Sequence, residues 1–242
     1  MTPEELVQQI DEAIPGRLSS AVLYGSAAAG DFVPQTSNYN LLLVVDRLDV
    51  AVLNALSRPS LAWAKAGHRP PLLFTPSELK TSAEWFPIEL LDIRQSRRVL
   101  FGDDPLAGIA VRREHLRLQL ERELKEKLLA LREGYLLTGG SPKRVLALLT
   151  ASVASFLVLF RAALRLFQEE VPREKIEAVK LLAQSISFDP QPLVVIDALK
   201  HRQRKPREVV PQLLFESYLA TIEQVVDAVG RHLHPQTGSA PP

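Results

Sequence analysis

Two short segments near the start of the chain have the residue types that could bind a phosphorylated ligand. The first is Gly25-Ser26, which follows the apolar run 20–24. A glycine lets the backbone turn sharply and come close to a phosphate, and a serine offers both an N–H and a hydroxyl. A helix beginning here would point its free N–H groups at the anion. An ordinary turn between a strand and a helix is the simpler alternative.

The second step is Asn38-Tyr39-Asn40, which comes after a spacer of eleven residues, 27–37, and opens the apolar run 40–45. Side chains at positions i and i+2 of a strand point to the same face, so we expect Asn38 and Asn40 to lie together. Each would present a neutral amide there. The alternative is that both are polar turn residues preceding a strand.

Gly-Ser, a spacer of this length and a polar-x-polar step at the head of a strand together resemble the DNA polymerase β-like nucleotidyltransferase superfamily. The pattern is most similar to the small bacterial members, including aminoglycoside nucleotidyltransferases, which join such a domain to a helical bundle. In that family Asp-x-Asp or Asp-x-Glu holds the magnesium ions. The resemblance implies nucleotide binding at Gly25 and Ser26. It also implies that Asn38 and Asn40 occupy the metal positions, with two negative charges lost.

The loss of both charges predicts impaired or absent catalysis. Magnesium gives up its water reluctantly and relies on carboxylates and phosphates, and phosphoryl transfer depends on positioning and electrostatics. Mg2+ is therefore the expected cofactor of an active protein, and no cofactor is expected of an inactive one.

The family also has a third carboxylate on a later strand. The candidate is Glu89, with Asp92 as the alternative, in the apolar run 87–93. Because they are three positions apart, they cannot both face one side of a regular strand. A salt bridge to Arg94, Arg97 or Arg98 is the alternative role for either carboxylate.

Other polar clusters give weaker indications. The basic run 201–207 could contact RNA or a nucleotide phosphate, but a solvated loop explains it more simply. His232 and His234 lack neighbouring residues that would complete a metal site. The absence of cysteine excludes disulfides, thiol nucleophiles and Cys-ligated zinc. With 29 Lys and Arg against 28 Asp and Glu, the chain has no strong net field to recruit nucleic acid or an anionic membrane.

The elements that must position these residues fall into two groups. Strands are expected at 20–24, 40–45, 71–75 and 87–93, and helices at 2–14, 27–29 and 49–57. Beyond 102–105 the pattern becomes helical, with helices at 111–137, 142–167, 172–186, 190–201 and 207–233. The prediction is an α+β nucleotidyltransferase-like domain at 1–107, a mixed small sheet flanked by helices, followed by an all-α helical bundle at 108–236 and a disordered tail at 237–242.

Residues 145–160 are almost wholly apolar but shorter than the roughly 20 residues that span a bilayer. We therefore expect a buried bundle helix and no membrane partner. The acidic start of the chain differs from the basic and then apolar start of a signal peptide, which predicts a cytoplasmic protein.

Three functions remain open at this point. The first is a nucleotidyltransferase-fold protein that binds a nucleoside triphosphate without turning it over. The second is an active, Mg2+-dependent nucleotidyltransferase that moves a nucleoside monophosphate onto a hydroxyl of a small molecule or protein, with Asp31 or Asp46 as a substitute carboxylate. The third is a non-catalytic interaction module whose bundle forms a homodimer.

Overall fold

The computed structural model describes residues 1–29 and 38–231. It divides into two compact units, Met1–His115 and Leu116–Pro242, and the second is described as far as Arg231. The first unit is a four-stranded sheet with helices and the second is helical, which confirms the predicted fold class.

The sheet of the first unit has the strand order β3-β2-β1-β4. Its strands are β1 (Leu18–Tyr24), β2 (Asn40–Val45), β3 (Leu72–Phe74) and β4 (Arg97–Gly102). β1 runs antiparallel to both β2 and β4, whereas β3 is parallel to β2, so the sheet is mixed. Nearly every residue of β1 and β2 is buried. This burial explains their continuous apolar sequences, because a strand covered on both faces has no polar side.

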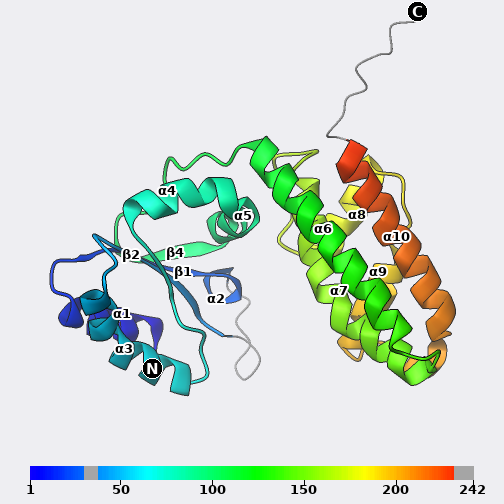
Figure 1. The fold of residues 1–242 in the computed structure, drawn as a ribbon, viewed down its shortest axis with the longest axis horizontal. Helices are drawn as coiled ribbons and strands as arrows, with labels where there is room; N and C mark the ends of the chain where they lie inside the picture. The colour runs from blue at the N-terminus through cyan, green and yellow to red at the C-terminus, as the bar shows by residue number, and fades with distance from the viewer. Residues whose placement is uncertain (30–37, 232–242) are drawn as a thin grey trace, which may run out of the picture. The chain divides into compact units, whose positions relative to one another are not determined.

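Helices cover the two faces of this sheet (Figure 1). Helices α1 (Pro3–Ala13) and α3 (Val50–Lys65) lie on one face, while α4 (Pro76–Trp85) and α5 (Pro87–Gln95) lie on the other. The short helix α2 (Ser26–Ala29) follows β1 directly. The sheet is therefore the central layer of three.

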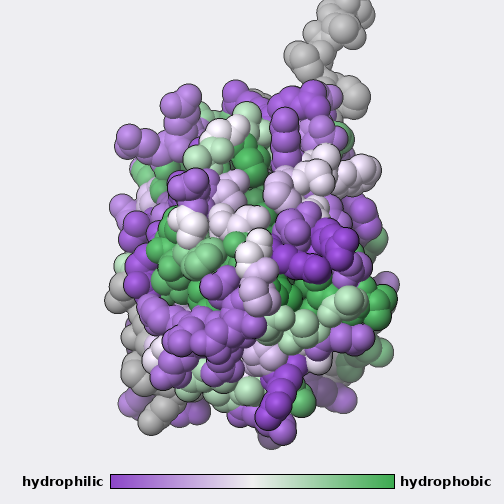
Figure 2. Space-filling view, turned by 90° about the vertical axis from the view of Figure 1, so that its left-hand side faces the viewer, coloured by the Kyte–Doolittle hydropathy of each residue, from purple (hydrophilic) through white to green (hydrophobic). Residues whose placement is uncertain are grey.

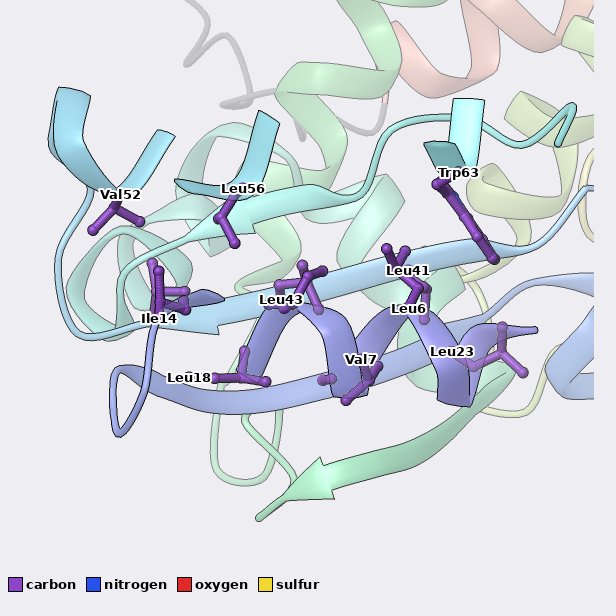
Figure 3. Packing of buried hydrophobic residues seen from close by; sticks show 13 residues of the cluster. Leu6, Val7, Ile14, Leu18, Leu23, Leu41, Leu43, Val52, Leu56 and Trp63 are labelled. Atoms are coloured by element: carbon purple, nitrogen blue, oxygen red, sulfur yellow. The ribbon is translucent and has the colours of Figure 1, made fainter. Parts of the chain in front are cut away.

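The face covered by α1 and α3 has the larger apolar cluster of the unit (Figure 3). Leu6 of α1 is fully buried against Leu41 and Leu43 of β2, and Trp63 of α3 closes the cluster. Complete burial of one such side chain stabilises the fold by about 1.5–3 kcal/mol. α1 is further fixed by a capping box between Thr2 and Glu5.

The predicted strand at 87–93 is wrong, because these residues form helix α5. Pro87 occupies the first turn of α5, a position that suits its fixed φ and missing N–H. Pro87, Leu90 and Ile93 are buried at a spacing of three residues, which fits one side of a helix. The fourth strand, β4, lies later in the chain.

The second unit is built around the apolar helix α7. Its elements are α6 (Arg113–Leu136, which starts in the first unit), α7 (Pro142–Leu164), α8 (Lys175–Ser185), α9 (Gln191–Lys200), the 3-10 turn η1 (Pro206–Glu208) and α10 (Pro211–Arg231). α7 packs against α8, α9 and α10. Within the described residues, α7 alone is long and apolar enough to cross a membrane. Its contacts with three other helices identify it as the core helix of the bundle.

Apolar side chains also reach the molecular surface. Figure 2 shows a face where polar residues are interrupted by apolar groups. The large apolar side chains exposed in the first unit include Val50 and Leu61 on α3, together with Trp85 and Phe86 at the junction of α4 and α5. Single exposed apolar residues are normal on proteins, so only a gathering of several indicates an interaction surface.

Candidate functional site

Gly25 directly follows β1 and has a backbone conformation that favours glycine. Its φ is +80°, in the left-handed region. Its N–H donates to the carbonyl of Ser96 at 3.0 Å, and its own carbonyl accepts from the N–H groups of Ala28 and Ala29. A Cβ at this position would stand 3.0 Å from the side-chain amide nitrogen of Asn40. The sharp turn predicted for Gly25 is therefore present and adjoins Asn40.

Ser26 opens helix α2 immediately after this turn. The first N–H groups of any helix have no acceptor within that helix, so the N–H groups of Ser26 and Ala27 are free of intrahelical bonds. Ser26 is partly exposed. Ala27 and Ala28 pack against the cluster beneath α1 and α3, which ties this short element to the core. The short helix predicted here is confirmed.

Asn40 is the first residue of β2, and Asn38 precedes the strand by two residues. Asn38 is exposed, whereas Asn40 is partly buried and pairs with Tyr24 of β1. Tyr24 also pairs with Arg97 of β4. Asn40, Tyr24 and Arg97 therefore form a row across three strands at one end of the sheet, and Tyr24 packs into the cluster beneath α4 and α5.

Arg97 is held by Asp104 in this row. The Nε and Nη2 atoms of Arg97 donate to one oxygen of Asp104, at 3.1 and 2.7 Å. The other oxygen accepts from the N–H of Leu106 at 3.0 Å. Burial acts to raise the pKa of Asp104, but the bonds from Arg97 and Leu106 and the nearby positive charges outweigh it and lower the pKa. No sequence pattern indicated this pair, since Asp104 lies in a polar loop.

Tyr24 occupies the middle of the row. Burial raises the pKa of its hydroxyl, and the positive charge of Arg69 acts against this rise. The Arg69 side chain is exposed. Neither residue was assigned a role from its sequence context, because a tyrosine at the end of an apolar run cannot be told from a core residue.

Tyr39 joins an aromatic cluster with Trp63 and His68. Its ring centroid lies 6.0 Å from that of Trp63 and 5.0 Å from that of His68, and Trp63 and His68 are 4.2 Å apart. Trp63 also donates from its Nε1 to the carbonyl of Arg69 at 2.8 Å. Burial, together with the charge of the N-terminal amine, lowers the pKa of His68. This cluster fixes the residue between Asn38 and Asn40.

Glu89 and Asp92 do not lie on a strand, contrary to the expectation from the sequence. Both belong to α5, where Glu89 is exposed and Asp92 is partly buried. Three residues apart on a helix, they are neighbours on one side, so the expectation that they face opposite ways is also wrong. Whether either has a catalytic role stays a prediction.

The residues present do not match the magnesium set that the resemblance implies. Within residues 1–29 and 38–231, no group of three or more His, Asp or Glu side chains could hold a metal ion. Asn38 and Asn40 offer neutral amides, which are weak magnesium ligands beside carboxylates. Asp46 is an exposed residue that follows the opposite end of β2 from Asn40 and accepts from the N–H of Arg47. Asp31 lies outside the described residues.

The basic run 201–207 forms the connection between α9 and α10. His201 Nδ1 lies 2.9 Å from the carbonyl of Asp197, and Arg204 pairs with Glu208. The remaining cations of the run are exposed. His232 and His234 lie outside the described residues.

Comparison of the sequence with protein-family models and with curated proteins finds no match. Among solved structures, the chain is similar to the crystal structure of spectinomycin adenyltransferase AAD(9) from Enterococcus faecialis with ATP and spectinomycin. That match has a TM-score of 0.48 and 15% sequence identity, and it covers 95% of this chain and 97% of the other.

Proposed function

We propose that the first unit binds the phosphate tail of a nucleoside triphosphate and does not catalyse metal-dependent nucleotidyl transfer. The observation that carries the proposal is that the Gly25 turn faces the amide of Asn40, which lies where a side chain at position 25 would reach. A turn suited to close phosphate approach thus adjoins a neutral donor and acceptor.

The turn at Gly25 supplies groups that can bind a phosphate. Gly25 presents no side chain, and the N–H groups at the start of α2 are free of intrahelical acceptors. The Ser26 hydroxyl adds a further donor. The Asn40 amide can donate to a phosphate oxygen, whereas an aspartate there would repel the anion unless a metal lay between them.

The asparagines at positions 38 and 40, where the resemblance implies carboxylates, also argue against catalysis. Nucleotidyl transfer needs positive charge to stabilise the negative charge that develops on the transferring group. Two neutral amides neither recruit magnesium strongly nor activate an attacking hydroxyl. Binding without transfer is the function that this side-chain set supports best.

Calorimetric titration of the full chain with ATP, GTP, CTP and UTP, each with and without Mg2+, tests the proposal. We expect at least one nucleotide to bind with an affinity that Mg2+ does not raise, and Ser26→Ala to weaken that binding. Ser57→Ala is the matched control, because Ser57 is an exposed serine of α3 whose hydroxyl donates to the carbonyl of Asn54 in its own helix turn. It should bind as the wild type does.

The double substitution Asn38→Asp with Asn40→Asp restores the carboxylates that the resemblance implies. We expect it to make nucleotide binding depend on Mg2+. Release of pyrophosphate by the wild-type chain in the presence of Mg2+ would contradict the proposal and favour the active enzyme. Failure of all four nucleotides to bind would leave a non-catalytic interaction module.

A further inference from the structure

One end of the helical bundle gathers exposed aliphatic side chains and cations. At this end α6 finishes, α7 starts, α9 finishes and α10 starts (lower right of Figure 1). The side-chain amide of Gln212 donates to the carbonyl of Gly140 at 3.1 Å, which joins the start of α10 to the connection between α6 and α7. The rings of Tyr135 and Phe215 stack 4.0 Å apart across the same junction. We call this region the basic end.

The connection between α9 and α10 belongs to the basic end as well. Thr221, in the middle of α10, donates to the carbonyl of Asp189, just before α9. The bond between Thr221 and Asp189 places the start of α9 beside the middle of α10. From this level, α9 and the first half of α10 each extend by about 15 Å, at 1.5 Å per residue. Since η1 leads directly into α10, residues 200–207 lie at the same end as Leu136 and Gly140.

Four large aliphatic side chains protrude at the basic end. Leu136 and Leu137, at the end of α6, are 79% and 81% exposed. Val210 and Leu213, at the start of α10, are 57% and 61% exposed. The neighbouring rings of Tyr135 and Phe215 stack on each other, and Phe215 is buried. The exposed apolar surface here is therefore aliphatic.

Cations share the basic end with these aliphatic side chains. Residues 200–207 include five Lys and Arg residues and no acid, although positive and negative charges nearly balance over the whole chain. Lys143 and Arg144 add two more at the start of α7, and Arg144 approaches Gly139. Arg204 pairs with Glu208, and the other six cations of this end are exposed. Glu208, the partner of Arg204, is the exposed acid closest in sequence to the aliphatic side chains, and Glu133 and Glu216 come next.

We infer that the basic end docks on an anionic lipid surface. Leucines that protrude from helix ends insert into the boundary between headgroups and acyl chains, while lysines and arginines around them meet lipid phosphates. A nucleic acid would use the cations, but single strands are recognised mainly through aromatic stacking and polar contacts, and the exposed apolar side chains here are aliphatic. A folded protein partner would need a complementary hollow for four protruding side chains, whereas a lipid surface adapts to them.

Co-sedimentation of the full chain with lipid vesicles tests this inference. We expect binding to vesicles of phosphatidylcholine mixed equally with phosphatidylglycerol and no binding to phosphatidylcholine alone. Raising the salt concentration should weaken binding, because dissolved ions screen the attraction between the exposed cations and the anionic lipids. The variants Leu136→Ser with Leu137→Ser, and Arg202→Gln with Lys205→Gln, should each lower the partition coefficient by about tenfold.

Two double variants serve as matched controls. Leu118→Ser with Leu129→Ser removes leucines of α6 that are 50% and 57% exposed but lie away from its end. Lys175→Gln with Lys180→Gln removes two exposed lysines of α8. Both controls should bind vesicles as the wild type does, with unchanged circular dichroism in all four variants.

Three outcomes would overturn the inference. The first is a wild-type chain that does not bind anionic vesicles at low salt. The second is equal vesicle binding by the test and control variants. The third is a concentration-dependent dimer that dissociates in Leu136→Ser with Leu137→Ser, which would identify a second copy of the chain as the occupant. None of these results depends on nucleotide binding by the first unit.

Discussion

Substitution of Gly25 by alanine should destabilise the first unit by a calculable amount. An L-residue in the left-handed region costs about 1–2 kcal/mol, and Gly25 has a φ of +80°. The new Cβ would also meet the Asn40 amide at 3.0 Å. Because this amide is the end of a flexible side chain, its displacement should add less than about 1 kcal/mol. The expected loss is therefore about 1–3 kcal/mol in the free energy of unfolding.

Two other glycines separate the contributions. Gly16 has a φ of +69°, and a Cβ there would meet nothing within 4 Å, so Gly16→Ala should show the backbone cost alone. Gly102 has a φ of +67°, and a Cβ there would lie only 2.0 Å from the carbonyl oxygen of Ser19, which cannot move aside cheaply because it belongs to the backbone. Gly102→Ala should therefore be the most destabilising of the three, at more than about 3 kcal/mol.

Urea unfolding followed by tryptophan fluorescence measures these changes. The two tryptophans, Trp63 and Trp85, both belong to the first unit, so their signal reports its unfolding separately from that of the bundle. Gly25→Ala should also lose nucleotide binding, whereas Gly16→Ala should keep it. An unchanged urea midpoint for Gly25→Ala would refute the left-handed turn. Unchanged nucleotide binding in a folded Gly25→Ala variant would refute the role given to the open space between the Gly25 backbone and the Asn40 amide.

Three further substitutions probe other contacts. Asp104→Asn should cost about 1–2 kcal/mol by weakening the bonds from Arg97. Since the folded-state pKa of Asp104 is lowered, the wild type should lose this stabilisation as pH falls from about 3.9 through the folded-state pKa, and an acid titration of fluorescence should show a smaller loss in the variant. The pKa of His68 is also lowered in the fold, so stability should decline as pH falls below about 6.5, and His68→Phe should flatten that decline in urea midpoints. Tyr218→Phe should cost about 1 kcal/mol by removing the bond to Ser152, measured by urea unfolding of the full chain followed by circular dichroism; no change would mean that this bond contributes nothing.

The strands that carry the candidate site could be predicted from the sequence, because their burial is recorded in their composition. β1 and β2 lie in the middle of the sheet and are apolar on both sides, and few other structures explain such short runs. The positions of Gly25 and Asn40 follow from these two strands. The helix predicted at 49–57 exists but continues to Lys65 with Pro59 inside it, and a proline usually indicates the end of a helix.

The error at 87–93 has a physical cause. A short apolar run fits either a buried strand or a buried helix, and so few residues give too little periodicity to decide. β4 escaped detection because it begins with two arginines and is an edge strand with no fully buried side chain. Both arginines have acidic partners in the fold: Arg97 pairs with Asp104, and Arg98 pairs with Glu4, which lies 94 positions away in the sequence.

The pairing of β1 with β4 also affects how the chain folds during synthesis. Ser20 bonds to the carbonyl of Asp103, 83 positions later, so the sheet depends on contacts of high sequence separation. Such contacts close large loops and form slowly compared with the neighbouring-helix contacts of a bundle. A chain emerging from the ribosome carries β1 with one unpaired edge until residues 97–102 arrive. Apolar strands with open edges recruit other strands, so nascent chains that stop short of β4 should be the ones that aggregate or need a chaperone.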